Sequence, residues 1–213
     1  MPIYPGEGPA VWLCLTVNFL VFAGIMYGRN VRDSLFLSQF GTQYLPHMYI
    51  ANAVVLVICS MFYTSLVDRI DRGRFLASVS LIFVGMLLAS RVILLQQRPW
   101  FYAVLYILAQ AIWNFSLLQF WTFLGDLFDS RQAKRLFPLI AVGSLLGMIA
   151  VGLTSRPLVN AIGTENILLV WAGLISGALI LGGVVYKTYR KAKEAPAGTL
   201  IGPPPGPKLS EWE

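Results

Sequence analysis

The chain has 213 residues, of which 57% are hydrophobic and only 12% are charged, and its formal net charge is +6. A soluble domain carries about 25% charged residues, so this composition excludes a disordered chain, a collagen, a coiled coil and a secreted disulfide scaffold. It favours an all-α, polytopic membrane protein, because a spanning helix needs about 20 apolar residues and 213 residues can hold about six such spans.

The N-terminal segment 1–9 precedes the first apolar run and contains neither Lys nor Arg. It lacks the basic region and the cleavage site of a secretory signal, so we expect the first span to be a retained helix. The transmembrane domain 10–186 follows, and none of its apolar runs has the alternating pattern of a membrane β-strand. The predicted spans are 10–28, 46–67, 75–95, 99–125, 136–155 and 164–186.

Lys and Arg are distributed unevenly over the segments between these spans. The connections 68–74 and 126–135 and the tail 187–213 together hold eleven of them, whereas the other three connections hold four. Because cytoplasmic loops are enriched in Lys and Arg, we expect both termini to lie in the cytoplasm. The basic residues form short clusters between spans and no basic domain, which argues against nucleic-acid binding.

The tail 187–213 has two parts. Residues 187–193 are basic, and we favour a stop-transfer anchor over specific recognition of anionic lipid for them. The remainder is too rich in Pro and Gly to pack alone, so we expect it to be disordered unless a partner binds it. Trp212 is the candidate residue for docking on that partner.

The spans offer few groups for chemistry. No carboxylate falls in the middle third of any predicted span, which argues against a proton relay. His47 is the only histidine, so one chain cannot build a metal site from two imidazoles, and Cys14 and Cys59 are typical of buried small residues. Without a nucleotide-binding loop or a hydrolase motif, we expect neither an enzyme nor a bound cofactor.

Uncharged polar residues also enter the spans, most densely in the fourth. Gln110, Asn114 and Trp121 project in broadly similar directions on a 3.6-residue period, and this face could hydrogen-bond and stack against a ligand. Hydrogen bonding between helices is the alternative, and we favour it. The other polar residues within spans are Asn18, Asn52, Ser116 and Gln119.

Two pairs of glycines are spaced by four residues, Gly143 with Gly147 and Gly173 with Gly177. Such pairs let two helix backbones approach closely. We expect them to pack within the chain, and dimerisation is the alternative use.

Three stretches resemble known transporters. YGRNVRDSLFLSQFG at 27–41 and FWTFLGDLFDSRQAKRLF at 120–137 resemble the ATP/ADP translocase (nucleotide transporter) family and its uncharacterised bacterial relatives. LVDRIDRGR at 66–74 resembles the loop between spans two and three of the major facilitator superfamily. The resemblance implies the N-terminal six-helix half of a twelve-span transporter, in a bacterial inner membrane.

The superfamily resemblance also implies a cytoplasmic latch in the second connection. In that superfamily an Asp and an Arg of this loop form the latch, and the alternative is a set of ordinary interfacial charges. The residues concerned are Asp68, Arg69, Arg72 and Arg74.

The nucleotide-transporter resemblance implies a role for Arg32, which falls where the nucleotide exchangers carry a basic residue facing phosphate. An ion pair with Asp33 or a snorkelling role is the alternative. The family pattern has an acidic residue early in span four, whereas this chain has Gln110 and Asn114 there. That difference argues against nucleotide exchange.

Two functions fit these observations. We favour an accessory or structural subunit of a larger membrane complex, because alternating access needs two halves and six spans form one. The alternative is a transporter for a nucleotide or another organic anion, built from two copies or with a separately encoded half. Its pore residues would be Arg29, Arg32, Asn114 and Trp121. An assembly factor or a lipid-handling protein is a third interpretation.

Overall fold

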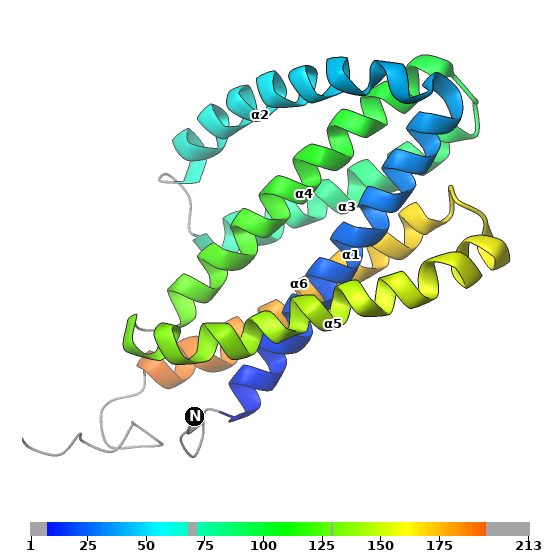
Figure 1. The fold of residues 1–213 in the computed structure, drawn as a ribbon. Coiled ribbons are helices and arrows are strands. Elements are labelled where there is room, and N and C mark those ends of the chain that lie inside the picture. Colours follow the sequence, from blue (N-terminus) through cyan, green and yellow to red (C-terminus); the bar gives the residue numbers. More distant parts are fainter. Residues whose placement is uncertain (1–7, 68–71, 129, 195–213) are drawn as a thin grey trace, which may run out of the picture.

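The computed structural model describes residues 8–67, 72–128 and 130–194. Within these ranges every long element is a helix and no strand occurs, which confirms the predicted all-α fold. Six helices are long and apolar enough to cross a membrane. In chain order the elements are α1 (Gly8–Phe40), the 3₁₀ turn η1 (Thr42–Tyr44), α2 (Leu45–Val67), α3 (Arg72–Leu94), α4 (Pro99–Leu127), α5 (Ser130–Ile162) and α6 (Ile167–Glu194) (Figure 1).

The first helix is longer than predicted, because α1 continues past residue 28 to Phe40. Residues 29–40 contain neither Gly nor Pro, so nothing in them interrupts a helix. Gly41 follows the helix with a φ of 74°, a conformation that glycine adopts at little cost. The predicted connection 29–45 is therefore mostly helix, and its charged residues lie on the bundle.

The fifth helix also exceeds its predicted span 136–155, since α5 begins at Ser130 and ends at Ile162. It contains Pro138 and Pro157, and it runs through Pro157 beyond the predicted end of the span at residue 155. A proline removes only one backbone donor, and spanning helices tolerate this loss where neighbouring groups satisfy the freed carbonyl.

The central helix of the bundle is α1, which packs on α4, α5 and α6, while α3 packs mainly on α6 (Figure 1). Helix α2 meets the rest of the bundle chiefly at α4, and no residue is buried in its apolar window, which runs from Thr42 in η1 to Met61. We name the two ends of the bundle after the ends of α1, the Gly8 end and the Phe40 end.

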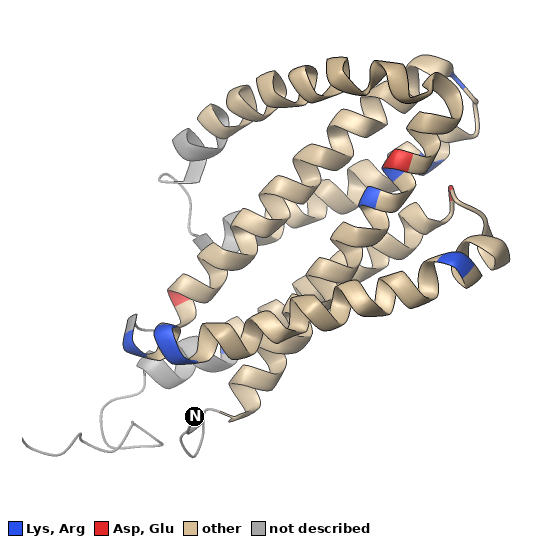
Figure 2. Cartoon of the chain, in the orientation of Figure 1, with Lys and Arg blue, Asp and Glu red and all other residues tan. Residues whose placement is uncertain are grey.

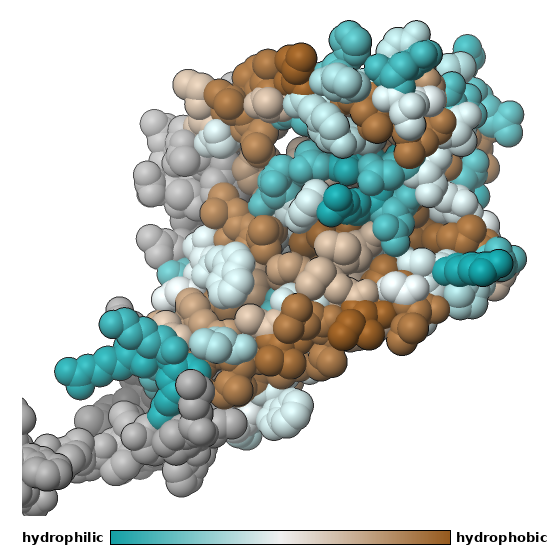
Figure 3. Space-filling view, viewed as in Figure 1, coloured by the Kyte–Doolittle hydropathy of each residue, from teal (hydrophilic) through white to brown (hydrophobic). Residues whose placement is uncertain are grey.

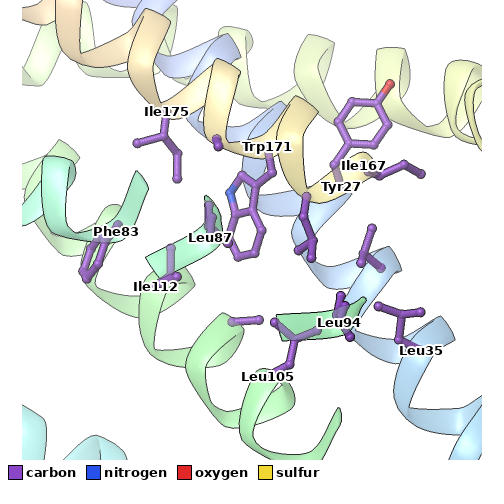
Figure 4. Close-up of a cluster of buried hydrophobic side chains, with 14 of the residues drawn as sticks. Tyr27, Leu35, Phe83, Leu87, Leu94, Leu105, Ile112, Ile167, Trp171 and Ile175 are labelled. Carbon is purple, nitrogen blue, oxygen red and sulfur yellow. The ribbon is translucent and has the colours of Figure 1, made fainter. Parts of the chain in front are cut away.

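The buried hydrophobic side chains form two clusters. The first contains Trp171 of α6, which is 1% exposed, together with residues of α1, α3 and α4 such as Leu35, Leu87 and Ile112 (Figure 4). The second joins the start of α1 to the end of α4, the start of α5 and the later part of α6. Together the two clusters fix α1 against α4 and α6 along its length.

The indole of Trp171 lies directly against two glycines of α1. A Cβ added at Gly28 would lie 2.5 Å from the Trp171 ring, and one added at Gly24 would lie 2.9 Å from it. The two glycines are four residues apart, the same spacing as in the pairs Gly143 with Gly147 and Gly173 with Gly177. This third pair makes room for a large side chain.

The glycine pair of α5 lies against the backbone of α1. A Cβ added at Gly147 would lie 2.9 Å from the carbonyl oxygen of Phe19, and one added at Gly143 would clash with the carbonyl oxygen of Leu15. These two helices therefore approach each other with no side chain between them at either glycine.

The glycine pair of α6 does not make the close backbone approach that we expected. An added Cβ at Gly177 would meet only the Leu20 side chain, at 3.6 Å, and one at Gly173 would meet no atom within 4 Å. The spacing of two glycines does not by itself identify the helix face that packs.

Candidate functional site

Most charged residues of the described ranges lie at the ends of helices, and Figure 2 shows α1 as the main exception. Arg29, Arg32 and Asp33 lie in the body of α1, seven to eleven residues before its end at Phe40. Charges in a spanning helix are rare and usually face a bundle interior or a water-filled cavity. This group is therefore the starting point for a functional site.

The guanidinium of Arg32 is buried between α1 and α4, with 6% of the side chain exposed. Its Nε and Nη2 atoms both lie 2.9 Å from Oδ1 of Asp33, and Nη1 donates to Oε1 of Gln110. The guanidinium carbon lies 4.3 Å from the centroid of the Tyr106 ring, a cation–π distance. The ion pair with Asp33 is thus formed, and Gln110 and Tyr106 hold its cation in place.

Arg29 lies one turn earlier on α1 and is far more accessible. Its side chain is 50% exposed, and its Nε lies 3.9 Å from Oδ2 of Asp33. Its guanidinium carbon lies 5.5 Å from the centroid of the Trp113 ring. Because one carboxylate faces two guanidinium groups, these three charged residues keep a net charge of +1.

On α4 the contributing residues are Tyr106, Gln110 and Trp113, which share one helix face because they are spaced by four and three residues. We call Arg29, Arg32, Asp33, Gln110 and Trp113 the α1–α4 site. Tyr106 and Trp113 were missed by the sequence analysis. Their spacing from Gln110 is the signal that could have identified them.

Two predicted ligand residues do not take part directly. Asn114 turns its amide back along α4, where Nδ2 donates to the backbone carbonyl of Gln110 at 3.0 Å. Trp121 lies eleven residues after Gln110, about 16 Å along the helix, and its ring centroid lies 5.7 Å from that of Phe137 in α5. The structure therefore brings Arg29 and Arg32 together, without Trp121.

Polar contacts continue from the site onto α5. Nδ2 of Asn30 donates to Oγ of Ser155 at 3.2 Å, and the hydroxyls of Tyr27 and Thr154 lie 2.6 Å apart. Figure 3 shows hydrophilic side chains gathered over α1 and α4 toward the Phe40 end, with hydrophobic surface on α5 and on part of α2 at its borders. The site thus lies on a polar face between two apolar helices.

Beside this site, Arg91 connects the end of α3 to the turn before α6. Its Nε donates to Oδ1 of Asn166 at 2.7 Å, and its Nη1 lies 3.3 Å from Oε2 of Glu165. These contacts join two helices at the Phe40 end, so Arg91 has a structural role there.

Several predicted positions fall beyond what the structure describes. Asp68 and Arg69 of the latch loop lie outside the described residues, as does Trp212. Arg72 and Arg74 lie in the first turn of α3, but their side chains are not described. Among the side chains that are described, no group of three His, Cys, Asp or Glu residues could hold a metal ion.

The fold and the α1–α4 site together define a polytopic membrane protein with charged groups held between spanning helices. Comparison with known protein families matches residues 88–194, half of the chain, to the family described as TLC ATP/ADP transporter. The chain therefore belongs to this family, and the resemblance to ATP/ADP translocases is confirmed. No curated protein and no solved structure matches the chain.

The matched range covers the end of α3 and all of α4, α5 and α6. It includes Gln110 and Trp113 but not the charged residues of α1. The assignment to a transporter family therefore comes from α4 to α6, independently of Arg29, Arg32 and Asp33.

Proposed function

We propose that this chain is a transport unit for an organic anion, and that the anion binds at the α1–α4 site. The observation that carries the proposal is the half-exposed side chain of Arg29, whose guanidinium lies beside Trp113 and next to Arg32, a cation that is already paired. Arg recognises carboxylate and phosphate groups through two parallel hydrogen bonds. The long contact of 3.9 Å to Asp33 leaves Arg29 able to donate such bonds to a solute.

Arg32 has a different role in this proposal. Its contacts to Asp33, Gln110 and Tyr106 use its guanidinium within the chain, so it positions the carboxylate and adds to the local positive potential. The solute then meets Arg29 and the Trp113 ring first, with Asn30 of α1 beside them.

The solute class follows from the same residues. The family name specifies ATP and ADP, whose phosphates suit an arginine fork and whose base would stack on an indole ring. In this chain Gln110 and Asn114 are neutral, and the site carries a net charge of +1, so a carboxylate or a monophosphate is an equally suitable solute. We propose an organic anion, with nucleotides as one member of that class.

Alternating access requires a second six-helix unit opposite the first. We propose that this unit faces the polar surface of α1 and α4 between α2 and α5, and that a second copy or a separately encoded half supplies it. The distribution of Lys and Arg supports cytoplasmic termini, and the resemblance to bacterial proteins supports an inner membrane. In this arrangement the Gly8 end faces the cytoplasm, and the α1–α4 site, which lies toward the Phe40 end, opens to the side of the membrane away from the cytoplasm.

Binding to the purified protein tests the proposal. ADP, AMP, inorganic phosphate and a dicarboxylate are added in turn to protein in mild detergent, and the shift in melting temperature is measured. We expect at least one anion to stabilise the wild type and Arg29→Gln to weaken its binding about tenfold or more, because a charge-assisted hydrogen bond is lost. Arg98→Gln removes a charge from an exposed position at the same end and should leave binding unchanged.

An accessory subunit of a larger membrane complex is the second candidate. The observation that favours it is α2, which exposes apolar and aromatic side chains such as Tyr49, Ile50 and Met61 that another membrane protein could cover. Purification in mild detergent would then recover stoichiometric partner subunits. Deleting residues 196–213, which contain Trp212, should weaken that association. Recovery of a protein without partners that transports an anion would contradict this candidate.

A further inference from the structure

A cavity of about 150 Å³ lies among α1, α3, α4 and α6, in the half of the bundle away from the α1–α4 site. One of its lining residues, Gln119, follows Gln110 by nine residues, or about 13 Å along α4. Neither Arg29 nor Arg32 lines it. The cavity is thus separate from the proposed anion site.

The walls of the cavity are mainly hydrophobic and include no charged residue. Val17 and Val21 of α1, Phe120 and Phe123 of α4 and Ile175 of α6 supply much of the surface. Moving a charged group into such surroundings is unfavourable. The walls therefore suit a neutral molecule with an apolar body.

The polar lining residues are Ser80, Ser116, Gln119 and Tyr186. Among them Gln119 is buried, with 6% of its side chain exposed. Its Oε1 accepts a hydrogen bond from Oγ of Ser80 at 3.2 Å. Its Nε2 has no hydrogen-bond partner among the described residues. Since buried polar atoms are nearly always hydrogen-bonded, this amide is a donor that lacks an acceptor.

We propose that the cavity binds a small, neutral, lipid-soluble carbonyl compound, whose oxygen accepts a hydrogen bond from Nε2 of Gln119. A cavity of this size holds about one aromatic ring, which would pack on Phe120 and Ile175. Ser80 orients the amide by donating to its oxygen, so that the NH₂ group is left for the ligand.

The position of Gln119 along α4 favours a molecule dissolved in the membrane over a lipid headgroup. Gln119 lies seven residues before Asp126, about 10 Å into the helix from that charged position. Lipid headgroups stay in the polar region outside the hydrocarbon core. The ligand therefore reaches the cavity from the hydrocarbon, as a neutral solute.

The test compares two molecules of the same shape, acetophenone and α-methylstyrene. In α-methylstyrene a CH₂ group stands in place of the carbonyl oxygen of acetophenone. Each is titrated into the protein in lipid nanodiscs, with empty nanodiscs as the reference for partitioning into lipid. We expect the wild type to bind acetophenone about threefold to tenfold more tightly, which is the contribution of one neutral hydrogen bond. Gln119→Leu should bind the two molecules equally. Equal binding by the wild type, or a preference that survives in Gln119→Leu, would overturn the proposal.

A variant whose side chain fills the cavity provides a second test of the proposal. Gly182 lines the cavity, and a Cβ added there meets no atom within 4 Å, so Gly182→Leu should abolish binding of both molecules without disturbing the fold. Gly173→Leu is the matched control, because Gly173 has equal space on the same helix and does not line the cavity. Unchanged binding by Gly182→Leu would place the molecules elsewhere and refute the proposal. Arg29→Gln should bind both molecules normally, which separates this result from the fate of the anion site.

Discussion

Asp33 balances the charge of a nearly inaccessible cation, because the Arg32 side chain is 6% exposed and lies 2.9 Å from the carboxylate. Asp33→Asn would leave that guanidinium without a carboxylate. We expect the free energy of unfolding to fall by about 1.5–3 kcal/mol, the usual contribution of a hydrogen bond to a charged group. Denaturant unfolding in detergent, followed by circular dichroism, measures the loss.

Glu165→Gln provides the comparison, because it removes the carboxylate that lies 3.3 Å from Nη1 of Arg91. The Arg91 side chain is 20% exposed. The pair that is more accessible to solvent should contribute less. An equal or larger loss for Glu165→Gln would show that burial of Arg32 is not what makes Asp33 important.

Gly28 is the subject of a second prediction at the scale of a single residue. Its hydrogen atom occupies the place where a methyl group would overlap the Trp171 ring. Gly28→Ala should lower the free energy of unfolding by about 1–3 kcal/mol, as overpacking does. Gly85→Ala on α3 has open space around its Cβ and should be neutral, or stabilising by up to about 1 kcal/mol through helix propensity. If both variants had the same thermal stability, the close contact with Trp171 would be refuted.

Among the elements, the contact between α1 and α5 depends on glycines that let the two backbones meet. Gly143→Val places a side chain against the carbonyl of Leu15 and should separate the helices, lowering the melting temperature by several degrees. Gly152→Val, on the same helix with no atom within 4 Å of its Cβ, carries the same loss of glycine without the clash. The difference between the two melting curves measures the packing effect alone.

The existence of six helices could be predicted from apolar runs, because a membrane leaves few other structures for them. Their ends could not, since α1 after residue 28 is held by tertiary packing of a polar stretch that no hydropathy pattern marks. The predicted span 136–155 stops just before Pro157, whereas the helix continues through this proline to Ile162. Local sequence signals were overridden where neighbouring helices supplied contacts.

The candidate site was predictable only in part. Arg29 and Arg32 were named as pore residues on the resemblance to nucleotide transporters, and the structure places them on one carboxylate, Asp33. Trp121 was named with them, and its ring packs on Phe137. Trp121 lies about 16 Å from Gln110 along α4, so a shared direction does not bring it to the site, whereas Trp113 lies within one turn of Gln110. Trp171 gave no sequence signal, because its role depends on glycines more than 140 positions earlier.

For the whole molecule, we propose that another six-helix unit packs on the polar face of α1 and α4, beside the exposed apolar surface of α2. If that unit is a second copy, an engineered cysteine at Tyr49 of α2 should form a disulfide between two chains under oxidising conditions, while one at Leu81 on the exposed side of α3 should not. Both positions are exposed, so accessibility alone would label them equally. A cross-link at Leu81 and none at Tyr49 would contradict this arrangement.

If the chain carries an organic anion that meets Arg29, then Arg29 should be needed for transport. The decisive measurement is exchange of the anion that stabilises the protein most, followed as uptake of its radiolabelled form into preloaded proteoliposomes. We predict uptake by the wild type, loss of most of it in Arg29→Gln, and partial recovery in Arg29→Lys, which keeps the charge but not the fork. Uptake by Arg29→Gln at the wild-type rate would show that the solute does not meet Arg29.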